Sequence, residues 1–122
     1  MGDRKIDART FEFALLVVDG YKFLLGKKEF VLSKQFLRAG TSIGANVTEA
    51  QAAQSRKDFI SKMAIASKEA RETLYWIRLL KRSGFFKGYA KVNILESEIS
   101  SIINILTKIV KTTKEQQPKE KP

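Results

Sequence analysis

The feature that most constrains the fold is the position of the two prolines, Pro118 and Pro122, which leave residues 1–117 without any. A proline inside a helix costs about 3 kcal/mol or more, so a long proline-free segment can form long helices. The same segment is rich in alanine, leucine, lysine, glutamate and isoleucine, which favour helix. We therefore predict an all-α protein.

Local signals divide the chain into four predicted helices. Ser33 is a candidate N-cap, Ser55 with Asp58 resembles a capping box, and glycines follow the first and third helices and precede the fourth. The predicted helices span residues 8–25, 33–54, 55–82 and 89–114. Short connections predict an antiparallel up-down-up-down four-helix bundle over residues 1–114. Residues 115–122 are expected to form a disordered, charged tail.

Apolar residues recur at spacings of three and four in the last three helices, as expected for one buried stripe each. The stripes contain Phe36, Gly40, Ile43, Val47 and Ala50; Phe59, Met63, Ala66, Ala70, Leu74 and Ile77; and Val92, Leu95, Ile99, Ile102, Leu106 and Ile109.

The first helix is apolar over more than one stripe, at Phe13, Ala14, Leu16, Val17, Val18, Tyr21, Leu24 and Leu25. One neighbouring helix cannot bury all of these side chains. We expect the excess to mediate self-association. A deeply packed central helix is the alternative.

The chain contains no cysteine and no histidine. It therefore lacks thiolate metal ligands, disulfides and the usual general base near neutral pH. Glu69 and Glu72 share the Glu-x-x-Glu spacing, but di-metal helical bundles pair glutamate with histidine. Gly40 and Gly44 lack the Lys-Ser/Thr of a P-loop and are interpreted as helix-packing positions. We expect no enzyme activity, no cofactor and no metal.

The formal net charge is +10 and the isoelectric point is near 9.9. Such an excess favours RNA, DNA or an anionic surface as a partner, although a solvated lysine-rich surface is the plain alternative. No apolar run approaches the roughly 20 residues of a membrane span, and no signal peptide is visible. We expect a cytoplasmic protein without a membrane partner.

Polar residues flank the apolar stripes of the second and third helices. Arg38, Ser42, Asn46 and Glu49 share one side, and Glu69 and Glu72 lie near Trp76. Polar groups at the margin of a core need partners. We expect a structural polar network in which Arg38 pairs with one of the two glutamates. A small polar binding site is the alternative.

The strongest functional signal is a basic face on the third helix, which carries eight basic and three acidic residues between positions 55 and 82. On a helical wheel the nucleic-acid-binding candidates fall together: Lys57, Lys68, Arg71, Tyr75, Arg78 and Arg82. The cations can contact successive phosphates and Tyr75 can stack on an unpaired base. Lys108, Lys111, Lys114, Lys119 and Lys121 extend this surface. A solvated face with incidental charge is the alternative.

Two runs also resemble a known family. Residues 37–49 read LRAGTSIGANVTE, with Arg38, Ser42, Asn46 and Glu49, and residues 63–80 read MAIASKEARETLYWIRLL, with Lys68, Glu69, Glu72, Tyr75 and Trp76. These runs resemble the paired motifs of the bacterial four-helix-bundle proteins encoded in intervening sequences of 23S rRNA genes. Ala50 stands where many members have glycine.

The resemblance covers nearly the whole chain. It implies an up-down bundle that forms a ring-like homo-oligomer such as a pentamer. The family is similar in fold to the accessory proteins of diversity-generating retroelements, which are basic bundles associated with nucleic acid. It implies no catalytic residues. Two hypotheses remain: an oligomer that binds nucleic acid, with RNA preferred, and an oligomeric scaffold that docks a protein partner.

Overall fold

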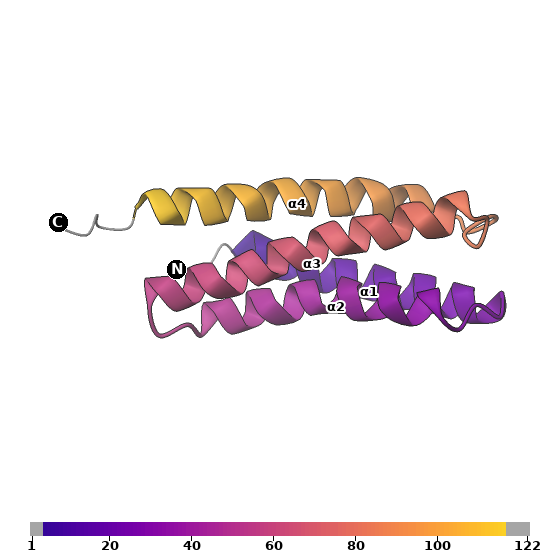
Figure 1. Cartoon of the computed structure of the whole chain (residues 1–122), viewed down its shortest axis with the longest axis horizontal. Helices are drawn as coiled ribbons and strands as arrows, with labels where there is room; N and C mark the ends of the chain where they lie inside the picture. Colours follow the sequence, from indigo (N-terminus) through magenta and orange to yellow (C-terminus); the bar gives the residue numbers. More distant parts are fainter. Residues whose placement is uncertain (1–3, 117–122) are drawn as a thin grey trace.

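Four antiparallel helices make up the described part of the molecule (Figure 1). This computed structural model describes residues 4–116, with α1 at Arg4–Gly26, α2 at Leu32–Gln51, α3 at Arg56–Arg82 and α4 at Val92–Glu115. Helices adjacent in sequence pack side by side, and α1 also meets α4 along the sparsest of the four seams. The predicted all-α, up-down-up-down bundle is confirmed. None of the helices in the described range is long and apolar enough to cross a lipid bilayer.

The helix boundaries differ from the prediction by a few residues. Helix α1 begins at Arg4, α2 ends at Gln51, and α4 begins at Val92 rather than at Tyr89. The connection between α3 and α4 is a series of turns that includes Gly84 and Gly88, at φ +91° and +84°. Glycine adopts such positive φ values without the penalty that a Cβ brings. Glu115 is the last residue of α4, and most of the expected tail, residues 117–122, lies outside the described residues.

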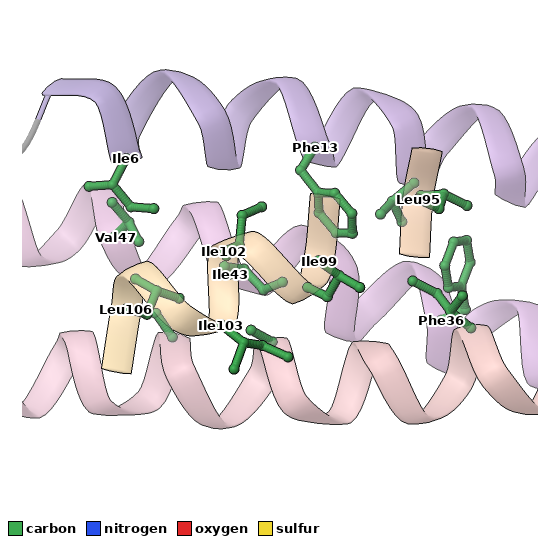
Figure 2. Packing of buried hydrophobic residues seen from close by; sticks show 14 of the residues in the cluster. Ile6, Phe13, Phe36, Ile43, Val47, Leu95, Ile99, Ile102, Ile103 and Leu106 are labelled. Carbon is green, nitrogen blue, oxygen red and sulfur yellow. The ribbon is translucent and has the colours of Figure 1, made fainter. Parts of the chain in front are cut away.

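The core lies between all four helices (Figure 2). Its fully buried side chains include Phe13 from α1, Phe36 from α2, Ile77 from α3 and Leu95 from α4. At the end of the bundle with the α1–α2 and α3–α4 loops, Phe36 and Tyr89 pack on Phe86 at ring-centroid distances of 5.6 and 5.3 Å. Apolar burial from every helix supplies the main driving force for this arrangement.

Helices α1 and α2 approach closely at the two glycines of α2. A Cβ built on Gly40 would lie 2.6 Å from Val17 Cγ2, and one on Gly44 would lie 3.2 Å from the carbonyl oxygen of Thr10. Both glycines are therefore packing positions, as predicted, and they let the apolar inner side of α1 lie directly against α2.

The start of α2 corrects a prediction. Ser33 is not the N-cap: it lies inside the helix, buried, and its hydroxyl donates to the carbonyl of Glu29 at 2.7 Å. The Glu29 carboxylate caps the helix instead, since it accepts from the Ser33 amide at 2.5 Å and the Val31 amide at 3.2 Å. Ser55 is the N-cap of α3 as predicted, because its hydroxyl accepts from the Asp58 amide at 3.0 Å.

Glu29 is only 8% exposed, yet the pKa of its carboxyl group is lowered from the ordinary glutamate value. Burial alone would raise this pKa because it disfavours the charged form. The amides of Ser33, Leu32 and Val31 donate to the ionised carboxylate and outweigh that effect. The α2 cap is therefore a charged one.

A second polar contact ties the α3–α4 loop to α1. The Tyr89 hydroxyl donates to Asp19 Oδ2 at 2.5 Å, and Lys91 Nζ lies 3.5 Å from the same oxygen. The hydrogen bond from Tyr89 lowers the pKa of Asp19, and the positive charge of Lys91 adds to this. The loop end of the bundle is thereby fixed by aromatic packing and by one charged anchor.

Candidate nucleic-acid interface

Five of the eight basic residues of α3, together with Tyr75, form one outward-facing row, called here the basic stripe: Lys57, Lys68, Arg71, Tyr75, Arg78 and Arg82. All six are exposed. They follow the 3.5-residue spacing of one helix face, while the opposite face, with Met63, Ala70 and Ile77, is buried. At 1.5 Å per residue the stripe is about 38 Å long.

The cations of the basic stripe are not neutralised by neighbouring carboxylates. Ion pairs among the described side chains use Arg9, Arg38, Lys62, Lys81 and Lys91, and none uses a stripe residue. Arg71 alone has a polar partner here, since its Nη2 donates to the Thr107 hydroxyl of α4 at 2.8 Å. A neutral partner leaves the full charge of Arg71 available to an anion.

Helix α4 adds cations to the same surface. A shallow groove of about 370 Å³ runs between α3 and α4 and is lined by Ser67, Arg71, Thr107, Val110, Lys111 and Lys114. Lys108 is also exposed on α4. The structure thus brings Lys111 and Lys114 beside Arg71, whereas Lys119 and Lys121 lie outside the described residues.

Tyr75 is the one aromatic residue in the stripe, and its side chain is 59% exposed. Its ring meets that of Trp76 edge to face, with centroids 5.1 Å apart and an interplanar angle of 76°. Edge-to-face packing is a favourable aromatic geometry. It leaves Tyr75 with at least one ring face free of Trp76.

The predicted polar network divides into separate groups. Arg38 bridges α2 and α3: Nη1 lies 3.3 Å from Glu69 Oε1, and Nη2 contacts Glu72 Oε2. Arg38 therefore pairs with both glutamates rather than with one. The same Glu72 oxygen accepts a hydrogen bond from Trp76 Nε1 at 3.1 Å.

The remaining residues of the expected network do not join this cluster. The Ser42 hydroxyl donates to the Ala39 carbonyl, and the Asn46 amide donates to the Ser42 carbonyl, so both serve their own helix. Glu49 pairs with Lys62 at 3.0 Å. Within the described residues no group of three or more acidic side chains gathers as a metal ion would require.

The outward side of α1 carries two large exposed apolar residues beside the charged Glu12 and Lys22. Phe11 is 63% exposed and Leu15 is 51% exposed. Beside Phe11 lies a groove between α1 and α2 that is lined by Ala14, Thr41, Gly44, Ala45 and Thr48. Helix α1 is therefore not a deeply packed central helix in the single chain. None of the eight apolar residues from which self-association was expected is exposed, since three of them are buried and five are partly buried. The exposed pair, Phe11 and Leu15, was not selected, although its 4-residue spacing was an available signal.

One acidic residue of this groove has an unsatisfied atom. Asp7 lines it, and the buried Oδ1 of Asp7 has no hydrogen-bond partner among the described residues. A buried polar atom without a partner costs free energy. The edge of this groove therefore carries an acidic side chain, in contrast to the cations of the basic stripe.

Comparison with known proteins agrees with this fold. A family model described as 23S rRNA-intervening sequence protein matches residues 3–108. No match is found among curated proteins.

Among solved structures, the chain is similar to a protein with unknown function from the S23 ribosomal protein family of Bacteroides thetaiotaomicron, whose crystal structure was determined at 1.70 Å. The two share 46% sequence identity with a TM-score of 0.85, over 91% of this chain and 99% of the other. Because the family model spans most of the sequence and the architecture agrees, the chain belongs to the 23S rRNA-intervening sequence protein family.

Proposed function

We propose that this protein is a non-enzymatic, cytoplasmic module that binds nucleic acid electrostatically along the basic stripe, with RNA preferred. The observation that carries the proposal is the row of stripe cations, exposed and without carboxylate partners among the described residues. Arg71, Lys111 and Lys114 at one groove extend it onto α4. Cations along such a row displace counterions from successive phosphates, which is a favourable, salt-dependent contribution to binding.

Self-association is part of this proposal. The exposed Phe11 and Leu15 lie on α1, whereas the basic stripe lies on α3 and borders α4. Copies that associate through the apolar side of α1 can leave their stripes open to solvent. Several stripes on one particle raise the affinity for a long RNA without any single strong site. The ring-like homo-oligomer, with a pentamer as the family resemblance suggests, belongs to this proposal.

The salt dependence of RNA binding tests the proposal. The stripe variant carries Lys68→Gln, Arg71→Gln, Arg78→Gln and Arg82→Gln. The control variant carries Lys22→Gln, Lys28→Gln, Lys34→Gln and Lys87→Gln, which remove the same charge from exposed positions elsewhere. Binding to a structured RNA is measured by fluorescence anisotropy across a salt series, together with light-scattering mass.

The stripe variant should lower the slope of log K against log salt by about 3 to 4, since each lost phosphate contact removes about 0.9 on duplex or 0.7 on single strands. The control variant should change the slope by less than about 1. Equal losses in the two variants would mean that net charge alone acts, and the stripe would then be only solvated surface.

The exposed apolar surface of α1 favours a second candidate, an oligomeric scaffold that docks a protein partner and has no nucleic-acid role. Its test is a variant with Phe11→Lys and Leu15→Lys, measured by light scattering with and without RNA. Under the first proposal the variant loses particle mass but a single copy retains weak, salt-sensitive RNA binding. An oligomer whose wild-type mass never changes with RNA, at low or high salt, favours the scaffold.

A further inference from the structure

A continuous series of contacts leads from α2 to the middle of the basic stripe. Arg38 on α2 contacts Glu72, Glu72 Oε2 accepts from Trp76 Nε1 at 3.1 Å, and the Trp76 ring packs on Tyr75 at 5.1 Å. Glu69 holds the other guanidinium nitrogen of Arg38 at 3.3 Å. The series thus joins the polar cluster between α2 and α3 to the exposed aromatic ring between Arg71 and Arg78.

We propose that Tyr75 is a stacking site for an unpaired nucleobase, and that Arg38, Glu72 and Trp76 are positioning residues that hold its ring in place. The inference rests on the proposed function, because the stripe must first bind the phosphates. It goes further by naming the class of ligand: single-stranded nucleic acid, or the unpaired loops of a folded one, in preference to duplex.

The exposure and setting of Tyr75 support stacking. An arginine lies one helical turn to each side of it, at Arg71 and Arg78, and both are exposed. A backbone bound by these cations brings its bases alongside the ring. The edge-to-face contact with Trp76 leaves a free face of Tyr75, and every nucleobase has a π-face that can stack on it.

The cluster behind the ring fixes its orientation. Trp76 is half-buried, and its indole N–H is satisfied by Glu72, so the hydrogen bond selects one arrangement of the indole. Arg38 in turn holds Glu72 from the neighbouring helix. Ordering a side chain before the ligand arrives removes part of the entropic cost of binding. Arg38 therefore has an effect on binding without lying in the stripe.

A basic surface is not expected to prefer unpaired bases on electrostatic grounds alone. A duplex has the higher linear charge density, so a purely electrostatic surface gains more from a duplex than from a single strand. Bases inside a duplex are already stacked on each other and present no free face. A stacking contact can reverse the electrostatic order, and Tyr75 is the stripe residue that can provide it.

The experiment compares three ligands with the full chain: an unstructured single-stranded RNA of about twelve nucleotides, a blunt-ended two-stranded duplex with the same total number of phosphates and no unpaired loop, and inorganic polyphosphate. The variants are Tyr75→Leu, Tyr75→Phe and Arg38→Gln. Arg9→Gln is the matched control, because Arg9 also joins two helices through a glutamate, at 2.9 Å from Glu98, and has no contact with Tyr75. Trp76 is the only tryptophan, so its emission reports on this site alone.

Wild type should bind the single strand more tightly than the blunt-ended duplex. Tyr75→Leu should weaken single-strand binding by about 5- to 150-fold while leaving duplex and polyphosphate binding unchanged, and Tyr75→Phe should retain wild-type binding. Arg38→Gln should weaken only single-strand binding, by about two- to tenfold, and Arg9→Gln should leave the preference intact. Emission from Trp76 should change on addition of the single strand and not of polyphosphate.

Two results overturn the inference while the proposed function stands: a wild type that binds the blunt-ended duplex and the single strand equally, or a Tyr75→Leu variant that loses affinity for all three ligands alike. If Arg9→Gln and Arg38→Gln both lose the preference for the single strand, Arg38 has only a general structural role. A wild type that binds none of the three ligands at low salt contradicts the proposed function itself.

Discussion

The outward faces of α1 and α3 occupy comparable places in the bundle but carry opposite chemistry. On α1, Phe11 and Leu15 expose more than half of their side chains. On α3, the corresponding row consists of cations and Tyr75. The inner faces of the two helices are alike, since both are lined by fully buried apolar residues such as Val17 and Ile77.

This contrast shows that the bundle fold constrains only one side of each helix. The core requires an apolar stripe from every helix, and both helices supply it. The outward side of each helix is free of that requirement, so its composition reflects the solvent or partner that it contacts. An apolar outward side favours another protein surface, and an unpaired cationic one favours a polyanion.

The largest expected effect is a difference in the free energy of unfolding between substitutions on the inner and outer sides of α1. Phe13 is fully buried and Phe11, two residues away, is 63% exposed. Phe13→Ala should lower the free energy of unfolding by about 3–5 kcal/mol, because it leaves a cavity in the core. Phe11→Ala should change it by less than about 0.5 kcal/mol per single chain. Chemical denaturation at concentrations where the protein is monomeric measures both, and similar losses would contradict the assignment of Phe11 to the outer side.

The next effect tests how tightly the inner side of α1 meets α2. In Gly40→Ala the new methyl would lie 2.6 Å from Val17 Cγ2, where the fully buried Val17 has no room to move. The clash costs about 1–3 kcal/mol and the gain in helix propensity is about 1 kcal/mol, so we expect a net loss of up to about 2 kcal/mol. Gly26→Ala is the control, since nothing lies within 4 Å of its Cβ, and thermal unfolding should show no loss there.

A smaller effect concerns the buried charge of Glu29 at the start of α2. This charge stabilises the folded bundle, and the outward faces of α1 and α3 exist only in the folded bundle. The pKa of Glu29 is lowered in the folded state, so its contribution to stability is present above the ordinary glutamate pKa of about 4.3 and is lost as the pH falls through the folded-state value. Glu29→Gln should cost about 1 kcal/mol at pH 7.

That difference between wild type and Glu29→Gln should shrink toward zero in acid, as urea unfolding at a series of pH values will show. Glu12→Gln, at an exposed position of α1, serves as the control and should differ little from wild type at any pH. A difference that stays constant from pH 7 to strong acid would mean that the charged cap is not what stabilises this helix start.

The smallest effect tests whether the cationic surface continues from α3 onto α4. Lys111→Gln removes one cation from the groove beside Arg71. The slope of log K against log salt for RNA should fall by about 0.7 to 0.9, with no change in thermal stability. Lys34→Gln, an exposed lysine of α2, should leave the slope unchanged. Identical slopes for Lys111→Gln and wild type would restrict the surface to α3.

The sequence predicts most of this fold because the relevant signals are local. Apolar spacing indicated the last three helices, and the Ser55 cap was visible from Asp58 three residues later. The cap of α2 was missed because the capping side chain lies outside the helix: Glu29, three residues before Leu32, accepts from the amides of Val31 and Ser33. The preferred N-cap residues are Ser, Thr, Asp and Asn, so Ser33 was selected and a glutamate before the helix was not.

The candidate site was predictable only in part. Helical spacing within α3 was enough to group the six residues of the basic stripe. The groove with Lys111 and Lys114 depends on which helices are neighbours, and the link from Arg38 to Trp76 depends on the relative register of α2 and α3. Those relations arise from packing between helices, where side-chain shape rather than local sequence decides the outcome.

The sparse seam between α1 and α4 also has a consequence for the order of folding. The other three seams join helices that follow each other in sequence, so they close short loops and can form quickly. The α1–α4 seam joins the two ends of the described chain, so forming it closes a larger loop and costs more conformational entropy. It also has the fewest contacts to offset this cost. We expect it to close last and to reopen first, so that amide hydrogens on α4 exchange with solvent sooner than those on α2.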